Sequence, residues 1–278
     1  MGDSDWRVDV LIVNYLTPDL AVRAAASAAG THGARVRVWD NSGDMQGAPG
    51  FELHGNGANI FFAAANNRLY ALGSAPYVML LNPDVELPVG SLDALIDHLD
   101  HHPDDWGVAP RLLGADGQTQ RYVRQLPTAR ALLADRLPPL RLIFGAPYRR
   151  YVCADVDHDE DHRLEQPPAA ALLLRREAVD AAGGLFDEDY PLFFNDVDLA
   201  RRLRTSGLCS YRADVTARHF GGASVRRAGR EGTDIGRMYD RALVAYARRN
   251  LPCASLLRVA AWLRRRIDLL RGPWWRQP

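Results

Sequence analysis

The sequence contains no lysine, so all 34 of its basic residues are arginine. Lysine supplies the amine of Schiff-base and pyridoxal enzymes and the phosphate-binding cation of Walker-type loops, and its absence excludes both mechanisms. Glycine is also missing after the first predicted strand, where Asn14-Tyr15 stands. A Rossmann dinucleotide-binding fingerprint, which needs a glycine-rich loop at that point, is therefore excluded as well.

Cysteines and long apolar runs are scarce. The three cysteines, Cys153, Cys209 and Cys253, match neither a metal-binding spacing nor a disulfide framework, which favours a reducing compartment. No apolar run approaches the roughly 20 residues of a membrane-spanning helix. The acidic residues 1–5 lack the basic-then-apolar layout of a signal peptide. We therefore expect a cytoplasmic protein.

Acidic and basic residues balance at 34 each, but they are unevenly distributed. Residues 1–225 contain 21 arginines and 30 acidic residues, whereas residues 226–278 contain 13 arginines and 4 acidic residues. This contrast predicts an acidic domain over residues 1–225 and a basic tail over residues 226–278. Such a tail suits an anionic partner, such as a lipid surface or a diphosphate, or docking on the acidic domain.

The chain opens with a pattern typical of a parallel sheet. The apolar residues 8–13 predict a strand, Thr17 and Pro18 predict the cap and first residue of a helix, and residues 35–39 predict a second strand. Strand, helix and strand in about thirty residues form a right-handed crossover unit. Asp40 ends the second strand at the carboxyl edge of the sheet, where it would either contact a nucleoside or cap a turn.

A second carboxylate is predicted at the same edge. Residues 78–81 are apolar and lie between prolines, which predicts a strand buried on both faces of a parallel sheet. Asn82-Pro83-Asp84 then ends the strand, because proline cannot donate to the sheet. Ligands of open α/β sheets bind at this edge, and a carboxylate there suits a divalent cation. An ordinary Asn-Pro-Asp turn is the alternative.

Two further segments carry ionisable residues. A helix is predicted from about residue 197, and Asp196 and Asp198 at its start point about 200° apart, so they cannot both face one substrate. One would be catalytic, or both would be capping residues. His219 follows a predicted strand and precedes a glycine pair, where it would reach a metal or serve a structural role.

Residues 137–168 lack periodicity and contain the acidic run at residues 155–162. Crowded ligand-type residues in a flexible loop are more often solvated than metal-bound, and we interpret the run that way. A long irregular segment within a compact domain is typical of a binding loop or lid.

The tail predicts two helices, over residues 235–249 and 255–270. The second combines an apolar stripe with arginines and is followed by Trp274 and Trp275, a composition typical of an interfacial membrane helix. A helix docked on the acidic domain explains the pattern equally well. The stripe consists of Leu256, Val259, Leu263, Ile267 and Leu270.

Taken in order, these motifs resemble the family-2 inverting glycosyltransferases of the GT-A fold, particularly their rhamnosyltransferase-like branch. The resemblance covers residues 8–224 and implies an α/β fold with a mostly parallel GT-A-type sheet flanked by helices, followed by a C-terminal helical extension. The stretches that carry it are Ile12-Val13-Asn14-Tyr15, Asp40-Asn41-Ser42, Asn59 with Asn66-Asn67-Arg68, Leu80-Leu81-Asn82-Pro83-Asp84, Arg124-Gln125-Leu126-Pro127-Thr128, Arg175-Arg176, Gly184-Leu185-Phe186-Asp187-Glu188, Asn195-Asp196-Val197-Asp198-Leu199, and His219 with Gly222 and Ser224.

The resemblance implies a role for each of the singled-out residues. Asp84 looks like the final aspartate of the family's DxD-type motif, which holds Mg²⁺ or Mn²⁺ against the donor diphosphate, and His219 matches the histidine that completes that site. Asp196 matches the general base, and Asp40 the residue that contacts the nucleotide base. The other donor contacts that the resemblance implies are Val13, Asn14, Asn67, Arg68 and Asn82.

The sequence departs from the family pattern at two of these positions. Asn82 stands at the first DxD position, so fewer charges would meet the metal. Asn195 stands before Asp196, where many relatives have glutamate, which leaves Asp196 as the only plausible base in that motif.

The implied activity is a metal-dependent, inverting transfer of a sugar from a dTDP- or UDP-sugar, dTDP-rhamnose included. The acceptor would be a hydroxyl of a glycan, a lipid-linked saccharide or a natural product. The expected partners are these substrates and, through the tail, the inner face of the membrane, with no nucleic acid. The alternatives are a nucleotidyltransferase that makes sugar nucleotides, which usually has a glycine-rich loop after strand one, and a non-catalytic nucleotide-sugar binding module, which has no need for Asp84, Asp196 and His219 together.

Overall fold

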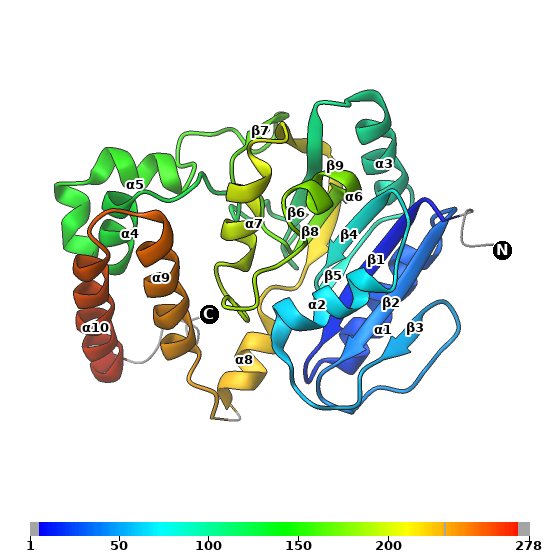
Figure 1. Ribbon diagram of the computed structural model, residues 1–278, viewed down its shortest axis with the longest axis horizontal. Helices are drawn as coiled ribbons and strands as arrows, with labels where there is room; N and C mark the ends of the chain where they lie inside the picture. Colours follow the sequence, from blue (N-terminus) through cyan, green and yellow to red (C-terminus); the bar gives the residue numbers. More distant parts are fainter. Residues whose placement is uncertain (1–5, 231, 272–278) are drawn as a thin grey trace.

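A computed structural model describes residues 6–230 and 232–271, and it contains a central sheet covered by helices on both faces (Figure 1). The sequence predictions on residues 1–5, Trp274 and Trp275 lie outside these residues. The strands are β1 (Val8–Asn14), β2 (Ala34–Asp40), β3 (Glu52–His54), β4 (Tyr77–Leu81), β5 (Val85–Glu86), β6 (Asp105–Leu113), β7 (His162–Leu164), β8 (Ala171–Arg175) and β9 (Leu208–His219).

The helices alternate with the strands in the first half of the chain and dominate its end. They are α1 (Pro18–Ala29), α2 (Phe61–Ala71), α3 (Ser91–His101), α4 (Ala129–Arg136), the 3₁₀ helix η2 (Pro138–Leu142), α5 (Gly145–Tyr151), α6 (Arg176–Ala181), α7 (Asn195–Leu203), α8 (Ala223–Arg230), α9 (Ile235–Asn250) and α10 (Ala254–Arg271). The described part of the chain has no helix that combines the length and the apolar character needed to cross a bilayer.

The sheet is mixed, with strand order β3-β2-β1-β4-β8-β6-β9-β5 and β7 paired to β9. Strands β1, β2, β3 and β4 are mutually parallel, as the crossover pattern predicts. Strand β8 runs antiparallel to both β4 and β6. The strand at residues 78–81 is therefore buried as predicted but has a parallel neighbour on one side only. The apolar sequence of β8 does not indicate whether the strand runs parallel or antiparallel to its neighbours, because a strand covered on both faces is apolar in either direction.

Each face of the sheet has its own apolar core. On one face, α1 and α3 pack through residues such as Ala24, Ala28, Leu95 and Leu99. The small alanines of α1 allow close approach of the helix to the sheet. On the other face, α2, α6 and α7 pack against alternate strand residues, including Leu80. The strands are thus fixed from both sides, and their carboxyl ends hold rigid positions.

One predicted helix cap differs from the structure, and a second helix begins without a side-chain cap. Helix α1 begins at Pro18 as predicted, but the Thr17 hydroxyl bonds Asn14 Oδ1 (3.1 Å) and does not cap the helix. Helix α3 begins at Ser91 itself, with Gly90 in the cap position, and the Ser91 hydroxyl donates to the carbonyl of Thr216 (3.0 Å). In both cases another hydrogen-bond partner competes with the helix backbone for the hydroxyl.

The segment predicted as irregular, residues 137–168, contains the short helices η2 and α5 and strand β7. The acidic side chains of the run are exposed, and three of its aspartates pair with arginines, as in Arg149 with Asp155 and Arg111 with Asp159. In the part of the chain that the structure covers, no group of three or more acidic, histidine or cysteine side chains is arranged to hold a metal. The solvated interpretation of the run agrees with this arrangement.

The tail folds back on the rest of the molecule, where α4, α5, α9 and α10 lie at the end remote from β1, β2 and β3 (Figure 1). Arg249 of α9 pairs with Asp187 (2.5 Å) and with Asp189, and Arg136 pairs with Asp240 of α9 (2.6 Å). The predicted boundary at residue 225 falls within α8. A third apolar cluster joins α9 and α10 to α4 and α7, and its buried members are Leu132, Tyr190, Phe194, Val197, Ala242, Leu243, Tyr246, Ala247 and Leu257.

A buried ion network ties β1 to β2 and α6. The Asp9 carboxylate in β1 accepts from Arg37 (2.5 Å), from Arg176 (2.8 Å) and from the backbone N–H of Ala75 (3.0 Å). Asp9 and Arg37 are almost completely excluded from solvent, and a Cβ added to Gly73 would overlap the Asp9 carboxylate. Charges buried this deeply are tolerated only when they are fully paired.

We expect Asp9→Ala to lower the free energy of unfolding by about 3–5 kcal/mol, because it removes the buried carboxylate that Arg37 and Arg176 share. The control is Asp155→Ala, which removes a pair whose side chains are both more than half exposed and should cost about 1 kcal/mol or less. Denaturant unfolding monitored by circular dichroism measures both. Equal losses for the two variants would contradict the importance of burial.

Candidate active site

The site is built at the point where the chain leaves β4. Asn82 donates its backbone N–H to Ala170 (2.8 Å) and accepts from Val85 (3.1 Å), so the chain reverses through Pro83 and Asp84. It then forms β5, which pairs antiparallel with the end of β9, with Val85 opposite His219. The Phe220 N–H donates to the Asp84 carbonyl (2.9 Å). This pairing places the side chains of Asp84 and His219 together.

The Asp84 carboxylate is held by a contact on each of its oxygens. Its Oδ1 lies 3.5 Å from His219 Nε2, and its Oδ2 accepts from the backbone N–H of Ala223 (3.1 Å). Burial alone would raise the pKa of this carboxyl, but the hydrogen bond and charge of His219 in its protonated form and the N–H of Ala223 outweigh it, so its pKa lies below the ordinary value. Asp84 is therefore ionised throughout the neutral range.

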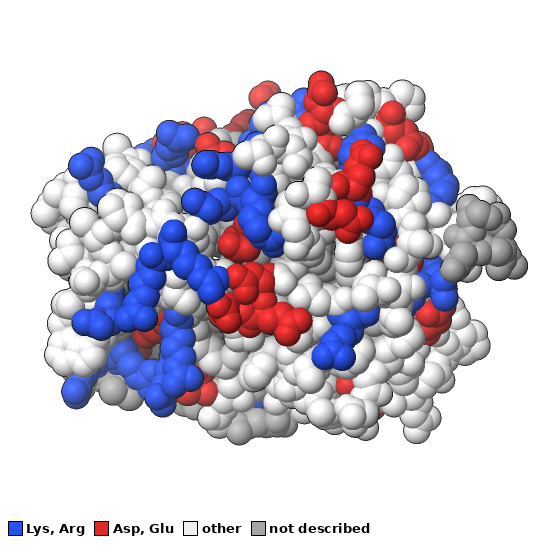
Figure 2. All heavy atoms as spheres, viewed as in Figure 1, with Lys and Arg blue, Asp and Glu red and all other residues white. Residues whose placement is uncertain are grey.

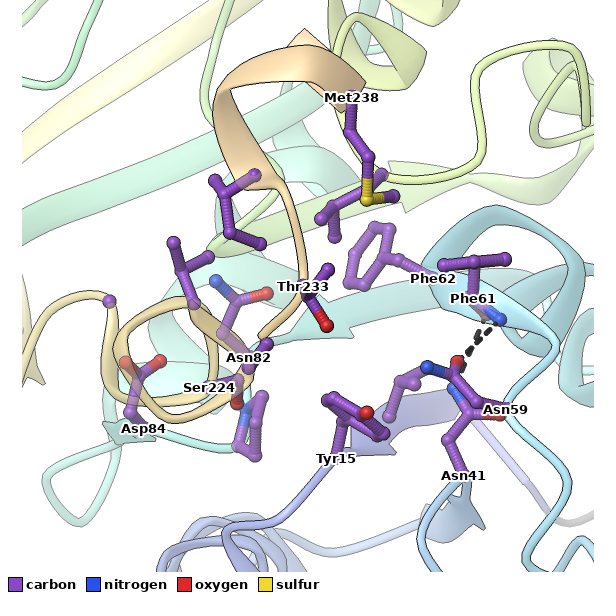
Figure 3. A pocket seen from close by; sticks show the side chains of 17 residues that line it. Tyr15, Asn41, Asn59, Phe61, Phe62, Asn82, Asp84, Ser224, Thr233 and Met238 are labelled. Atoms are coloured by element: carbon purple, nitrogen blue, oxygen red, sulfur yellow. Dashed lines mark hydrogen bonds between the residues drawn. The ribbon is translucent and has the colours of Figure 1, made fainter. Parts of the chain in front are cut away.

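A cavity of about 270 Å³ opens beside Asp84, and we call it the Asp84 cavity (Figure 3). Asp84 and Ser224 lie at one end and Asn41 and Asn59 at the other, with Tyr15 between them. Its remaining wall is largely apolar and includes residues that follow β9. The lining residues are Val13, Tyr15, Asn41, Asn59, Phe61, Phe62, Asn82, Pro83, Asp84, Leu192, Gly222, Ser224, Val225, Ala228, Thr233, Ile235 and Met238.

Asp40 and Asn14 do not line this cavity, although the sequence predicts both as donor contacts. The Asp40 carboxylate accepts from the N–H groups of Ser42 (2.9 Å) and Met45 (3.0 Å) and from the Asn14 amide (2.9 Å). Burial would raise its pKa, and these hydrogen bonds hold it below the ordinary value. Asp40 therefore shapes the loop, and its neighbour Asn41 presents the polar side chain to the cavity.

Asn67 and Arg68 also do not line the Asp84 cavity. The Asn67 amide bonds both the carbonyl and the N–H of Phe186 (2.9 and 3.0 Å), which fastens α2 to the loop before α7. Arg68 is exposed on the outer side of α2. The spacing of the Asn-Asn-Arg motif could not reveal this, because neighbouring positions on a helix point in different directions. By contrast, Val13 and Asn82, which the resemblance also implies as donor contacts, do line the Asp84 cavity.

Asp196 begins α7 and faces a second cavity of about 420 Å³, the Asp196 cavity. Its Oδ1 accepts from the N–H of Val197 (2.8 Å), and its Oδ2 accepts from the side-chain amide of Gln166 (3.2 Å). Asp198 instead pairs with Arg202 one turn along the helix (2.8 Å). The two aspartates thus face different surroundings, as their spacing predicts.

Burial raises the pKa of Asp196 from the ordinary value of 3.8 to about 6, although backbone N–H groups, that of Val197 first, oppose the shift. No cation pairs with this carboxylate in the described residues. A carboxylate with a pKa near 6 can accept a proton and release it again close to neutral pH, which is the property of a general base.

The two cavities share one wall, formed by Phe62, Asn82, Leu192, Gly222 and Val225. His219 lines the Asp196 cavity while its ring nitrogen faces Asp84. Asp84 and Asp196, which are predicted to act on one reaction, therefore serve adjoining spaces. A group bound against Asp84 and a group bound against Asp196 would meet at this common wall.

Backbone strain also gathers around the site. Leu16, Phe61 and Phe194 adopt the left-handed conformation, with φ of 60°, 65° and 65°. Phe61 lines the Asp84 cavity, and Phe194 immediately precedes α7 and lines the Asp196 cavity. This conformation is costly for residues with a Cβ and persists where the surrounding structure enforces it. Here it aims the starts of α2 and α7 at the two cavities.

The residues that line the Asp196 cavity were largely missed by sequence reasoning. Tyr122, Tyr151 and Tyr239 come from three separate segments and meet only in the folded chain. Gln166, which contacts Asp196, lies in the segment predicted to be irregular. The one available signal was the placement of a long loop of low periodicity, which is typical of binding segments.

The donors beside Asp84 fit a divalent cation of the kind the resemblance implies. Asp84 offers a carboxylate oxygen and His219 an imidazole nitrogen, while the described residues offer no third acidic, histidine or cysteine ligand. Mg²⁺ and Mn²⁺ sites with few protein ligands are typical where substrate phosphates and water complete the shell. The donor set therefore suits a cation that binds together with a diphosphate.

The raised pKa of Asp196 can be tested in the protein without substrate. Because its folded-state pKa is raised, the stability that the protonated group confers is complete below pH 4 and is lost as the pH rises through about 6. We expect the stability advantage of Asp196→Asn over wild type to grow by about 1–2 kcal/mol between pH 5 and pH 8. Denaturant unfolding at both values measures it.

The control is Asp198→Asn, which removes the ion pair with Arg202 and should be less stable than wild type at both pH values. A constant difference between Asp196→Asn and wild type would show that the Asp196 carboxyl has an ordinary pKa.

Comparisons with known proteins agree with the motifs. No family model matches the chain. The chain is 30% identical over 182 residues to N-acetylglucosaminyl-diphospho-decaprenol L-rhamnosyltransferase from two Mycobacterium tuberculosis strains, CDC 1551 / Oshkosh and ATCC 25618 / H37Rv. The match covers 60% of this chain and 57% of each relative, so the chain spans little more than half the length of these relatives.

Two crystal structures of S. aureus TarS share the fold with a TM-score of 0.53 at 10% identity. They cover 88% and 87% of this chain, which corresponds to 72% of the 1–349 fragment and 43% of the longer chain. At this identity the similarity shows the fold alone, and it confirms the predicted GT-A-type α/β architecture. The sequence match and the shared fold together support the resemblance of the chain to the rhamnosyltransferase-like glycosyltransferases of the GT-A fold.

Proposed function

We propose that this protein transfers a sugar, with inversion, from a nucleoside-diphosphate sugar to a hydroxyl of a lipid-linked saccharide. The observation that carries the proposal is the pair of adjoining cavities. One presents an ionised carboxylate beside an imidazole, and the other presents a carboxylate whose pKa is raised to about 6. A leaving diphosphate and an attacking hydroxyl need these two opposite environments.

The donor occupies the Asp84 cavity in this proposal. Asn41, Asn59 and Tyr15 bind the nucleoside end, and Asp84 and His219 lie where the diphosphate ends. A Mg²⁺ or Mn²⁺ ion held by Asp84 and His219 would neutralise the charge that develops on the departing diphosphate.

The acceptor occupies the Asp196 cavity. The acceptor hydroxyl gives its proton to Asp196 as its oxygen forms a bond to the anomeric carbon, while the bond from that carbon to the diphosphate oxygen breaks. Attack and departure take place on opposite faces of the sugar, so a single displacement inverts the anomeric configuration. Asp196 gains one proton and the diphosphate leaves with the electron pair of the broken bond.

The substrates are proposed from the relatives and from the cavity walls. The M. tuberculosis relatives are named for L-rhamnosyl transfer to an N-acetylglucosaminyl-diphospho-decaprenol. The apolar part of the Asp84 cavity, which includes Leu192, Val225 and Met238, suits the methyl group of a 6-deoxy sugar. Arg124 lines the Asp196 cavity and offers a cation to an acceptor diphosphate.

Incubation with dTDP-, UDP- and GDP-sugars, a diphospholipid-linked N-acetylglucosamine and Mg²⁺ or Mn²⁺ tests this proposal. We expect transfer with inverted stereochemistry and slow donor hydrolysis without acceptor. Asp196→Asn should reduce turnover by about 10²–10⁴-fold while donor binding is retained, and wild-type kcat/KM should fall below pH 6.

The same experiment distinguishes the alternatives. Dependence on pyrophosphate, with release of a nucleoside triphosphate, would indicate a nucleotidyltransferase. Donor binding without turnover would indicate a binding module. Full activity of Asp196→Asn would remove Asp196 from the role of base.

We also propose that α10 contacts an anionic membrane surface, where a lipid-linked acceptor would reside. One side of α10 packs inward through Leu257, Ala260 and Ala261. The opposite side exposes a stripe of apolar side chains, each 38–56% exposed, and arginines gather over α9 and α10 in Figure 2. Apolar side chains bordered by arginine, with no acidic residue among them, suit anionic lipid. The stripe consists of Leu256, Val259, Trp262, Leu263 and Ile267.

Vesicle sedimentation tests the role of this stripe. We expect the double variant Leu256→Ser/Leu263→Ser to bind phosphatidylglycerol vesicles several-fold more weakly than wild type, because it removes buried apolar area from the lipid contact. The control is Leu72→Ser/Leu208→Ser, which changes two leucines of similar exposure (50% and 49%) outside α10. Equal loss in both variants, or equal binding to neutral phosphatidylcholine, would contradict the proposal. Self-association that only the α10 variant abolishes would identify a second copy as the occupant.

A further inference from the structure

Gln120 lies just beyond β6, in a position that the strand fixes. After β6 the chain turns through residues 114–118 and returns as a short antiparallel bridge between Leu113 and Thr119. The Gln120 N–H donates to the Leu112 carbonyl (2.8 Å), which holds its backbone beside the sheet. From there its side chain reaches His219, at the end of β9. No motif in the sequence pointed to this residue.

The Gln120 side chain makes two hydrogen bonds to His219. Its Nε2 donates to the His219 backbone carbonyl (3.0 Å), and its Oε1 lies 2.8 Å from the ring nitrogen Nδ1. A carbonyl oxygen can only accept, so the NH₂ of the amide must face it and the amide oxygen must face Nδ1. The amide oxygen of Gln120 can likewise only accept a hydrogen bond. Nδ1 of His219 must therefore carry the proton of the hydrogen bond between them.

This contact decides which ring nitrogen remains available. With Nδ1 carrying a proton, the lone pair of the neutral ring lies on Nε2, the nitrogen that faces Asp84 Oδ1 at 3.5 Å. The ring is also held from the side by Tyr122, whose ring centre lies 5.4 Å away in an edge-on arrangement. The pairing of Val85 with His219 fixes the backbone. The imidazole thus has a defined position and a defined tautomer.

We infer that Gln120 is a positioning residue, which holds His219 in the Nδ1–H tautomer so that its Nε2 and Asp84 can bind one divalent cation together. The inference rests on the metal site of the proposed function and names a residue that acts on that site through His219. Ligand histidines generally need such a partner on their second nitrogen, and its loss typically weakens metal binding by about 10–100-fold.

The tautomer of His219 can be read without metal, substrate or turnover. In ¹⁵N-labelled, metal-free wild type at a pH where the ring is neutral, long-range ¹H–¹⁵N correlation spectra should show Nδ1 protonated and Nε2 bare. Gln120→Leu should shift the ring toward a mixture of tautomers, because leucine cannot accept a hydrogen bond. Gln120→Glu keeps an acceptor beside Nδ1 and should retain the wild-type tautomer. A protonated Nε2 in neutral wild-type His219 would overturn the inference whether or not any variant folds.

Manganese binding then measures the consequence. Titration of Mn²⁺ followed by electron paramagnetic resonance should give a dissociation constant about 10–100-fold higher for Gln120→Leu than for wild type and near the wild-type value for Gln120→Glu. The control is Gln118→Leu, two residues earlier in the same turn, which should bind Mn²⁺ as wild type does. Equal affinity of Gln120→Leu and wild type would refute the inference, as would equal losses for the Leu and Glu variants, which would indicate a role limited to the His219 carbonyl. Failure of the wild-type chain itself to bind Mn²⁺ would instead refute the metal site of the proposed function.

Discussion

The site depends on one backbone constraint, the antiparallel pairing of β5 with the end of β9. Strand β5 is only Val85–Glu86, yet it joins two segments far apart in the sequence and puts Asp84 against His219. The Phe220 and Ala223 N–H groups then bond Asp84 itself, so the first residues after β9 are fastened to the turn after β4. From there the chain continues into α8 and α9, whose residues line the Asp84 cavity. The pairing of β5 with β9 thus positions Asp84 and His219, the wall of the Asp84 cavity and the start of the tail.

The two carboxylates of the site have opposite electrostatic environments. Asp84 is buried and Asp196 is partly buried, and burial pushes both pKa values upward, but only Asp84 has an imidazole beside it. Its pKa therefore falls while that of Asp196 rises to about 6. Asp84 therefore stays charged at neutral pH, as its proposed role of cation ligand requires, and Asp196 exchanges a proton near neutral pH. Enzymes commonly separate the roles of paired titratable groups in this way. The raised pKa of Asp196 costs stability at neutral pH, as is common for functional groups.

Local chemistry explains what the sequence could predict. The ends of β4 at Leu81 and of β2 at Asp40 were predictable, because proline and polar turns stop apolar runs. The opposite directions of Asp196 and Asp198 follow from helix geometry. The direction of β8 was not predictable, because a doubly covered strand has no alternation to read. Asp40 and Asn67, predicted as donor contacts, do not line either cavity, because each uses its hydrogen bonds within the protein itself. Tyr122, Tyr151 and Tyr239 converge only through tertiary structure, and no spacing rule connects them.

The tail helices explain why the sequence fitted two interpretations equally well, docking on the acidic domain and contact with a membrane surface. Helix α9 docks on the acidic domain through a buried cluster around Tyr246 and through Arg249, whose pairing with Asp187 accounts for part of the basic charge. Helix α10 packs on α9 and α4 with one side and leaves its apolar stripe exposed on the other. Docking and surface binding therefore belong to different faces of one helical hairpin. Because Ile235 and Met238 of α9 line the Asp84 cavity, that hairpin connects a wall of the cavity to the exposed stripe. An attachment of α10 to a membrane would thus hold the substrate cavities at a fixed orientation to the lipid surface.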